Sequence, residues 1–489
     1  MDQPRRTSAP ARLRLITATA AALTLTGGLF LAATGPASAA APQVAAGDAD
    51  FNGDGYADVA ASVAFATVSG QQAAGQISVV YGNTAKHTTI SQNSAGVPGS
   101  AEKADNFGGD LAYGDFDADG FDDLAVGASG EDVGSDVDGG MVTILWGSAN
   151  GLSGGTTVTD PRPTKHDLFG FALQAGDFDG DGKDDLAVGT KFSATVDVIR
   201  GGISRSGATH GTYAVTAPIH TGDAGVRNLH SGDINGDGKD DLLVNGFEKD
   251  TEDGWDANFY LPGSASGVTA AGYKKLPAGI ITDVGDVNND GRGDIVFGLS
   301  WDDSIPHAQL GGAVLIAKGT ASGPAASVQT IDQDTAGVPG AGEKEDGFGD
   351  EIDLGDVNGD GHLDLVVGAP GEDVDGATDA GSITVLYGAA DGSGITGTGS
   401  QFFSQNSPRV PNNSEKNDYF GSDVHVDDLE TDGRGDIVVG AMGENADDGA
   451  VYTLHSNADG TFSGRSEYYV ATLGISASGT PGLGMNFAD

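Results

Sequence analysis

Seven copies of one nine-residue pattern carry the acidic side chains that could do chemistry in this sequence. The pattern reads D-x-[DNE]-x-D-G-x-x-D, and its copies span residues 50–58, 115–123, 177–185, 233–241, 286–294, 356–364 and 428–436. In a tightly curled loop the oxygens of alternate positions converge on one point, and glycine at position six permits the turn. Ca²⁺ prefers about six to eight oxygen ligands. The sequence has no cysteine to offer a softer metal. The pattern therefore predicts up to seven calcium sites.

Each site is expected to use the side chains of positions one, three, five and nine and the backbone carbonyl of position seven. The predicted ligands are Asp50, Asn52, Asp54, Tyr56, Asp58, Asp115, Asp117, Asp119, Phe121, Asp123, Asp177, Asp179, Asp181, Lys183, Asp185, Asp233, Asn235, Asp237, Lys239, Asp241, Asp286, Asn288, Asp290, Arg292, Asp294, Asp356, Asn358, Asp360, His362, Asp364, Asp428, Glu430, Asp432, Arg434 and Asp436. Plain turns also favour Asp, Asn and Gly, but a turn does not require acids at positions one, five and nine in every copy. Copies two and three carry four aspartates, whereas copy seven has the longer Glu430 at position three and is the weakest candidate.

Short apolar runs follow each nonapeptide and predict buried strands that position the loops. Leu124-Ala125-Val126 is one such run; a second apolar segment, Met141–Trp146, follows it, and Phe107–Tyr113 precedes the nonapeptide. With one further strand, each unit has about four strands and no convincing helix. Four-stranded units repeated seven times predict an all-β, seven-bladed β-propeller.

The flanking dipeptides resemble a known repeat. Phe-Gly precedes four of the nonapeptides, and Gly-Ala-Pro or a close variant follows the apolar run, at Phe107-Gly108, Phe169-Gly170, Phe348-Gly349, Phe420-Gly421 and Gly368-Ala369-Pro370. These phrases resemble FG-GAP repeats, which build the propeller of integrin α subunits and of many secreted bacterial proteins, and the resemblance covers residues 44–489. It implies that the calcium loops lie on one face and that ligands meet the opposite face. On this chain that face would include Glu131, Glu372 and Glu444, with Trp255 and Trp301 as candidate ligand-binding residues.

The N-terminal residues look like an export signal rather than part of the fold. Residues 1–39 combine four arginines, an apolar segment and a small-residue cleavage motif, Ala37-Ser38-Ala39, which favours a cleaved secretory signal peptide over a membrane anchor. The propeller is then expected over residues 40–489, in a secreted, monomeric protein without a membrane span. The full sequence has a formal charge of −47, so nucleic acid is an improbable partner. Calcium would offset part of this charge and replace the missing disulfides.

The favoured function is recognition or adhesion through an extracellular protein or glycan partner. A hydrolase of the FG-GAP-containing phospholipase type and a sugar-binding lectin are the alternatives. An enzyme is the less favoured class, because the G-x-S-x-G match at residues 151–155 leads into a loop rather than a helix. Two Arg-Gly-Asp tripeptides place their aspartates at position nine of a loop, where they should face an ion. Histidines and acids converging on the central channel would favour the hydrolase, and exposed Trp255 and Trp301 the lectin.

Overall fold

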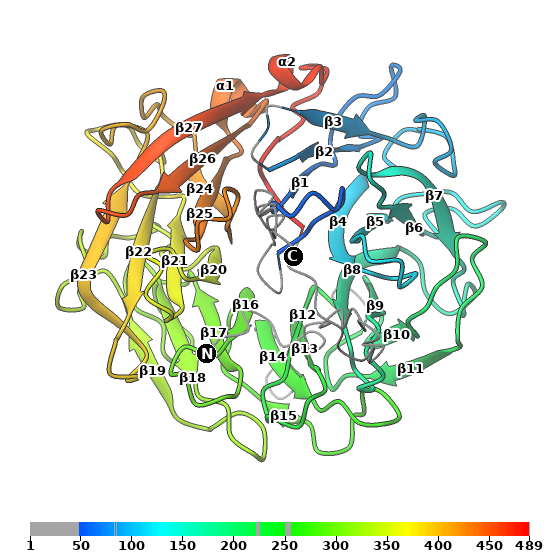
Figure 1. Cartoon of the computed structure of the whole chain (residues 1–489), viewed down its shortest axis with the longest axis horizontal. Coiled ribbons are helices and arrows are strands. Elements are labelled where there is room, and N and C mark those ends of the chain that lie inside the picture. The colour runs from blue at the N-terminus through cyan, green and yellow to red at the C-terminus, as the bar shows by residue number, and fades with distance from the viewer. Residues whose placement is uncertain (1–47, 83, 85, 222–224, 250–255, 489) are drawn as a thin grey trace, which may run out of the picture.

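The chain folds into a ring of seven antiparallel sheets around a central axis (Figure 1). The structure is a computed structural model that describes residues 48–488, apart from residues 83, 85, 222–224 and 250–255. The predicted signal peptide, residues 1–39, and Trp255 lie outside the described residues. The architecture confirms the all-β, seven-bladed β-propeller that the repeat spacing predicts.

Each blade takes consecutive strands of the sequence. Blade 1 contains β1 (Val59–Val63), β2 (Gln76–Val80) and β3 (His87–Ile90). Blade 2 contains β4 (Phe107–Gly114), β5 (Asp123–Ala128), β6 (Met141–Trp146) and β7 (Ser153–Val158). Blade 3 contains β8 (Phe169–Gly176), β9 (Asp185–Thr190), β10 (Thr195–Ile199) and β11 (Thr212–Thr216). Blade 4 contains β12 (Asn228–Gly232), β13 (Asp241–Phe247), β14 (Asp256–Leu261) and β15 (Lys274–Lys275).

Blade 5 contains β16 (Ile281–Gly285), β17 (Asp294–Leu299), β18 (Ala313–Ala317) and β19 (Val328–Ile331). Blade 6 contains β20 (Ile352–Gly355), β21 (Asp364–Ala369), β22 (Ser382–Gly388) and β23 (Ile395–Phe403). Blade 7 contains β24 (Phe420–Asp427), β25 (Asp436–Ala441), β26 (Ala450–Ser456) and β27 (Phe462–Tyr469). Two four-residue helices, α1 (Glu444–Asp447) and α2 (Val470–Leu473), flank the last strands. In the described part of the chain, no helix is long and apolar enough to cross a membrane.

The hydrophobic core is divided among the boundaries between neighbouring blades. The two middle strands of a blade are buried along their whole length, as in β5 and β6, whereas the outer strand β7 is polar and mostly accessible. This burial explains why the middle strands appear in the sequence as continuous apolar runs. Seven core clusters of described residues result, and each joins two neighbouring blades.

The C-terminal residues close the ring by completing blade 1. The backbone N–H of Ser62 donates to the carbonyl of Asn486 at 2.8 Å, and that of Ala488 donates to the carbonyl of Ala60 at 2.8 Å. Phe487 pairs with Ala61, so this segment takes the innermost place beside the three strands of blade 1. Because the first and last blades share hydrogen bonds, the ends of the ring cannot separate without breaking a sheet.

Candidate metal centres and the opposite face

The seven acidic loops occupy equivalent places in the seven blades. Loops two to seven each join the innermost strand to the next strand, as between β4 and β5, and their ninth residue begins that next strand. The glycine at position six has a positive φ in every copy, from 80° at Gly238 to 93° at Gly120. A side chain at that position would be strained, which is the physical reason for glycine there.

Position one holds the loop in its curled form. Both oxygens of Asp115 accept backbone N–H groups, from Asp119 at 2.9 Å and from Gly120 at 3.1 Å. Asp50 repeats the arrangement with Asp54 and Gly55, each at 3.1 Å. The first aspartate therefore folds the loop around its own carboxylate, as an Asx turn does.

Position nine is buried beneath the loop. Its carboxylate accepts a backbone N–H from just beyond the third strand of the same blade, at 2.8 Å between Gly147 and Asp123 and at 2.7 Å between Gly201 and Asp185. The second oxygens of Asp123 and Asp185 are buried and have no hydrogen-bond partner. Asp294, the aspartate of an Arg-Gly-Asp tripeptide, is fully buried in this way and cannot meet a receptor.

Burial and mutual repulsion oppose ionisation of the ninth residue. Loss of solvation is the larger cause and the other loop carboxylates add to it, so that the pKa of Asp58, of Asp123 and of Asp364 is raised to about 8. The same causes raise the pKa of Asp185 and of Asp241 to about 7. A bound cation would supply the charge that these buried carboxylates lack.

The donor set of loops two and three fits a hard cation. In loop two, carboxylate oxygens of Asp115, Asp117 and Asp123 all lie within 4.8 Å of one another, and loop three brings Asp177, Asp179 and Asp181 together in the same way. One oxygen each of Asp117 and Asp179 is buried without a hydrogen-bond partner. Oxygen-only donors around a small centre are the ligands that Ca²⁺ prefers.

The asparagine-containing loops are arranged differently. In loops one, four and five, the amide nitrogen of position three donates to the ninth aspartate, at 3.3 Å from Asn52, 3.1 Å from Asn235 and 2.6 Å from Asn288. Ligation would require each amide to present its oxygen instead. In loop seven, His455 Nδ1 lies 3.1 Å from an oxygen of Asp436 and 3.6 Å from one of Glu430.

Two arginines that the sequence reasoning missed contact the most acidic loops. Arg205, from blade 3, donates from Nε to Asp117 and from Nη2 to Asp119, both at 2.7 Å. Arg200, after β10, pairs with Asp179 of loop three. Both lie beyond a third strand, so Arg205 is 88 positions from Asp117 and Arg200 is 21 positions from Asp179. A basic residue at this point of the repeat is the signal that could have revealed them. The loops with four aspartates therefore also hold an internal cation.

Carboxylates at position eight link the first loops around the ring. Asp122 accepts the backbone N–H of Asp50 in the preceding blade at 2.7 Å, and Asp240 accepts that of Asp177 at 2.9 Å. At the junction of blades 7 and 1, Asp48 takes this role for Asp428 at 3.3 Å. Neighbouring loops are thus held by charge-assisted hydrogen bonds across the blade boundaries.

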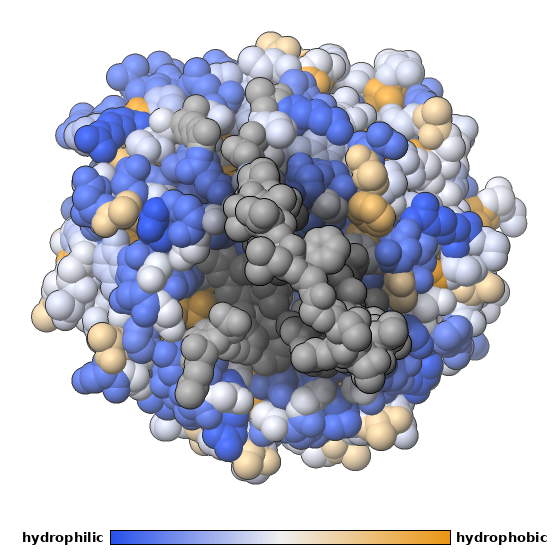
Figure 2. All heavy atoms as spheres, viewed as in Figure 1, coloured by the Kyte–Doolittle hydropathy of each residue, from blue (hydrophilic) through white to orange (hydrophobic). Residues whose placement is uncertain are grey.

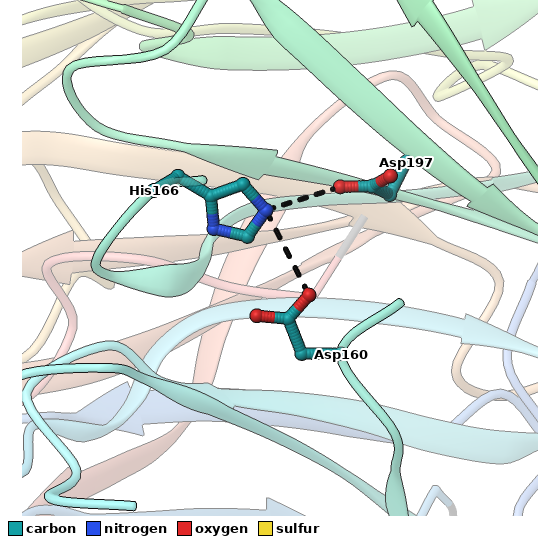
Figure 3. Close-up of side chains that lie close together, drawn as sticks. All are labelled: Asp160, His166 and Asp197. Carbon is teal, nitrogen blue, oxygen red and sulfur yellow. Dashed lines mark ion pairs between the residues drawn. The ribbon is translucent and has the colours of Figure 1, made fainter. Parts of the chain in front are cut away.

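A separate cluster between blades 2 and 3 combines acids with a histidine (Figure 3). His166 Nε2 lies 3.3 Å from Asp197 and 3.7 Å from Asp160. Arg162 binds both oxygens of Asp197, at 2.7 and 2.6 Å. Burial would raise the pKa of Asp197, but His166 and Arg162 together hold it below its ordinary value. This arrangement is a buried ion-pair network that ties the loop after β7 to β10, because the guanidinium already supplies the cation.

The central channel also carries acids and a histidine. A cavity of about 100 Å³ is lined by polar residues of the innermost strands, among them Asp110, Glu351, Asp353, Asp423 and His425. Desolvation raises the pKa of Asp110 and of Asp423 to about 7. Burial would lower the pKa of His425, but Asp427 and Asp353 raise it well above its ordinary value. Such groups converging on the channel are the feature that favours the hydrolase alternative.

The face opposite the acidic loops carries several exposed apolar side chains. In each blade the acidic loop leads into the second strand. The loop that leaves the far end of that strand therefore lies on the opposite face of the ring. Large apolar residues in these loops are 36% to 68% exposed, namely Phe65, Val133, Val137, Phe192, Leu310 and Met442. The side of the molecule that Figure 2 shows is mostly hydrophilic, with hydrophobic residues scattered among the polar ones.

The residues predicted for the ligand face have mixed environments. Trp301 lies in one of these loops but is only partly accessible and packs against the core between blades 4 and 5. Glu131, Glu372 and Glu444 each accept a hydrogen bond from a buried glutamine, at 2.6, 2.7 and 2.7 Å. The glutamates therefore brace the blade boundaries, and the exposed apolar residues were not singled out from the sequence because their exposure depends on the fold.

Comparison with known proteins agrees with the repeat pattern. The sequence model of the FG-GAP repeat matches residues 41–80, 107–145, 169–208 and 348–386. Phosphatidylinositol-glycan-specific phospholipase D of Mus musculus is 33% identical over 148 residues, which span 30% of this chain and 18% of that protein. Integrin alpha-PS2 of Drosophila melanogaster is 28% identical over 265 residues, which span 54% of this chain and 15% of that protein. The chain therefore carries FG-GAP repeats in a seven-bladed propeller, and it matches less than a fifth of the length of these relatives.

Solved structures add little to this assignment. A periplasmic gluconolactonase of Pseudomonas aeruginosa aligns with 88% of this chain and 99% of its own at a TM-score of 0.47 and 13% identity.

Proposed function

We propose that the chain is a secreted, calcium-loaded propeller that recognises an extracellular protein or glycan. The observation that carries the proposal is that the two faces of the ring differ in the side chains they expose. One face repeats an acidic loop seven times, and the other exposes apolar side chains from five blades. Calcium would stiffen the first face, and the apolar side chains exposed on the second would contribute the non-polar part of a contact with a partner.

The resemblance to an integrin α subunit supports the same proposal. The N-terminal segment with its small-residue cleavage motif supports export. Calcium at millimolar concentration outside cells would match the weak affinity, of order 10⁻⁴–10⁻³ M, that is typical of extracellular calcium modules.

The test is a retention screen of the purified chain against glycans, matrix polymers and cell-surface extracts, in millimolar calcium and in EDTA. Selective retention that requires calcium is the expected result. The matched variants are Phe192→Ser and Leu310→Ser, which alter the proposed recognition face, and Thr84→Ser, which changes a residue outside it. Retention that is unaffected by both serine variants of the apolar residues would place recognition elsewhere.

A hydrolase is the second candidate, and the channel cluster is what favours it. Asp110 and Asp423 have a pKa near neutral, which suits a general acid. The partial match to a phosphatidylinositol-glycan-specific phospholipase D makes glycosylphosphatidylinositol-anchored proteins the first substrates to assay. Turnover that disappears in Asp423→Asn would support hydrolysis; turnover that survives this change would exclude the channel as its site.

A further inference from the structure

A cavity of about 300 Å³ lies where the ring closes, between blade 7 and blade 1. Apolar side chains from both blades, from α2 and from the closing segment surround it, namely Val59, Ala61, Val80, Leu429, Val438, Val451, Leu473 and Leu483. The cavity is distinct from the central channel and the exposed apolar face, and it borders the seventh acidic loop through Leu429. It is called the seam pocket below.

The seam pocket exists because the side chains that face it are smaller than their counterparts elsewhere. Equivalent register positions can be compared, since β1 pairs with β2 as β5 pairs with β6. The side chains of blade 1 that face blade 7 are Val59, Ala61, Ser78 and Val80. Their counterparts in blade 2, which face blade 1, are the larger Leu124, Val126, Thr143 and Leu145. On the other wall, Thr453 and His455 stand where blade 2 has Ile144 and Trp146.

Polar atoms inside the seam pocket lack hydrogen-bond partners. Ser78 Oγ and Thr453 Oγ1 are buried, with their residues 1% and 5% exposed, and neither hydroxyl makes a hydrogen bond. They line the cavity from opposite walls, on β2 and β26. An unsatisfied buried hydroxyl is costly, so two that face one cavity indicate a group that they would bind there.

The charges around the seam pocket restrict what this group is. His455 lies at the wall with Nδ1 3.1 Å from Asp436, and Glu430 lies just beyond. Because the described lining residues include no lysine or arginine, an anionic ligand would lose its hydration there without gaining a charge partner. The apolar walls favour a hydrocarbon body, and the volume accommodates roughly ten non-hydrogen atoms at about 30 Å³ each.

We propose that the seam pocket binds a small uncharged amphiphile, with an aliphatic or aromatic body and a hydroxyl or carbonyl group held by Ser78 and Thr453. The ligand would fill the space between the first and last blades, so its binding would also stabilise the closed ring. This proposal does not depend on the identity of the extracellular partner.

The experiment titrates octan-1-ol into the calcium-loaded chain and follows binding by saturation-transfer NMR, with octanoate as the charged counterpart. Saturable binding of octan-1-ol that exceeds binding of octanoate is expected. Thr453→Val preserves the shape and removes one hydroxyl, which should weaken octan-1-ol binding roughly fivefold to tenfold. The control is Thr143→Val, which removes a similarly buried and unpaired hydroxyl in blade 2.

A second variant fills the cavity with the side chains of blade 2, as Val59→Leu/Ala61→Val/Val80→Leu. Binding should be lost in this variant while melting remains cooperative. The proposal is overturned if the parent shows no saturable signal, if the filled variant binds like the parent, or if octanoate binds as tightly as octan-1-ol. Equal effects of Thr453→Val and Thr143→Val would also overturn the assigned hydroxyl contact.

Discussion

Replacing Asp123 by asparagine tests two properties of the second acidic loop: the free-energy cost of burying this carboxylate, and its proposed role as a calcium ligand. Asparagine keeps an oxygen for the N–H of Gly147, which lies 2.8 Å from the Asp123 carboxylate. The change removes a buried ionisable group and a proposed calcium ligand without altering the volume of the side chain. The structure therefore predicts opposite effects on the calcium-free and the calcium-linked parts of the stability.

Without calcium, Asp123→Asn should stabilise the chain. Burial and the neighbouring carboxylates raise the pKa of Asp123 from 3.8 to about 8. At pH 7 the folded group holds a proton that the unfolded group releases, so folding loses up to about 4 kcal/mol. The penalty shrinks as the pH falls toward 4, to about 1.5 kcal/mol at pH 5. With an unfolding entropy of roughly 1 kcal/mol per kelvin for a chain of this length, the melting temperature in EDTA should rise by about 4 °C at pH 7.

With calcium, the same variant should gain less. One site with a Kd of order 10⁻⁴ M adds about 1.4 kcal/mol at ~1 mM calcium. The increment in melting temperature between EDTA and calcium should therefore shrink by about 1–2 °C, and calorimetry should find one ion fewer. Asp334→Asn, at an exposed position outside the loops, is the matched control. An unchanged ion count in Asp123→Asn, or a lower melting temperature in EDTA, would refute the reasoning.

Three further predictions concern the whole ring, its internal cations and its channel. Seven sites of this affinity would add at most about 10 kcal/mol, so EDTA should lower the melting temperature by up to about 10 °C, and no change would contradict calcium binding. Arg205→Gln should tighten calcium binding at loop two several-fold in calorimetry, because the guanidinium competes for Asp117 and Asp119; Arg227→Gln, whose partner is Asp256, should not. Asp110→Asn should increase the free energy of unfolding, measured by urea denaturation, by up to about 4 kcal/mol at pH 8 and change it little near pH 4. The reason is that burial raises the pKa of Asp110 to about 7, so the folded state is penalised only above the unfolded pKa. Equal effects at both pH values would show that Asp110 is solvated in the channel.

The repeat made much of the architecture predictable. The spacing of the nonapeptides predicted the number of blades, and the apolar runs after them predicted strands such as β5 and β9 to within two residues at each end. Glycine at position six anticipated the positive φ found there. Residues 483–489 resemble the start of an eighth unit, which predicts a strand that closes the ring, and the hydrogen bonds of Asn486 and Ala488 with blade 1 confirm it. These features are local, because residues close together in the sequence determine the periodicity and the backbone conformation.

The contacts between blades could not be predicted in this way. Arg205 reaches Asp117 across 88 positions of sequence, and Asp48 reaches Asp428 across 380. The partial burial of Trp301 and the exposure of Leu310 depend on how one loop folds back on its blade. The seam pocket is formed by side chains that face each other only after the ring has closed.

The sequence by itself thus determined the repeating unit: its strands, its turn and its acidic loop. Tertiary structure alone decided which loops carry an arginine, which carboxylates lose their solvation, and where the packing leaves space. The physical reason is that a repeat sets each blade's own geometry, whereas charge, burial and cavity volume arise from surfaces that different blades contribute.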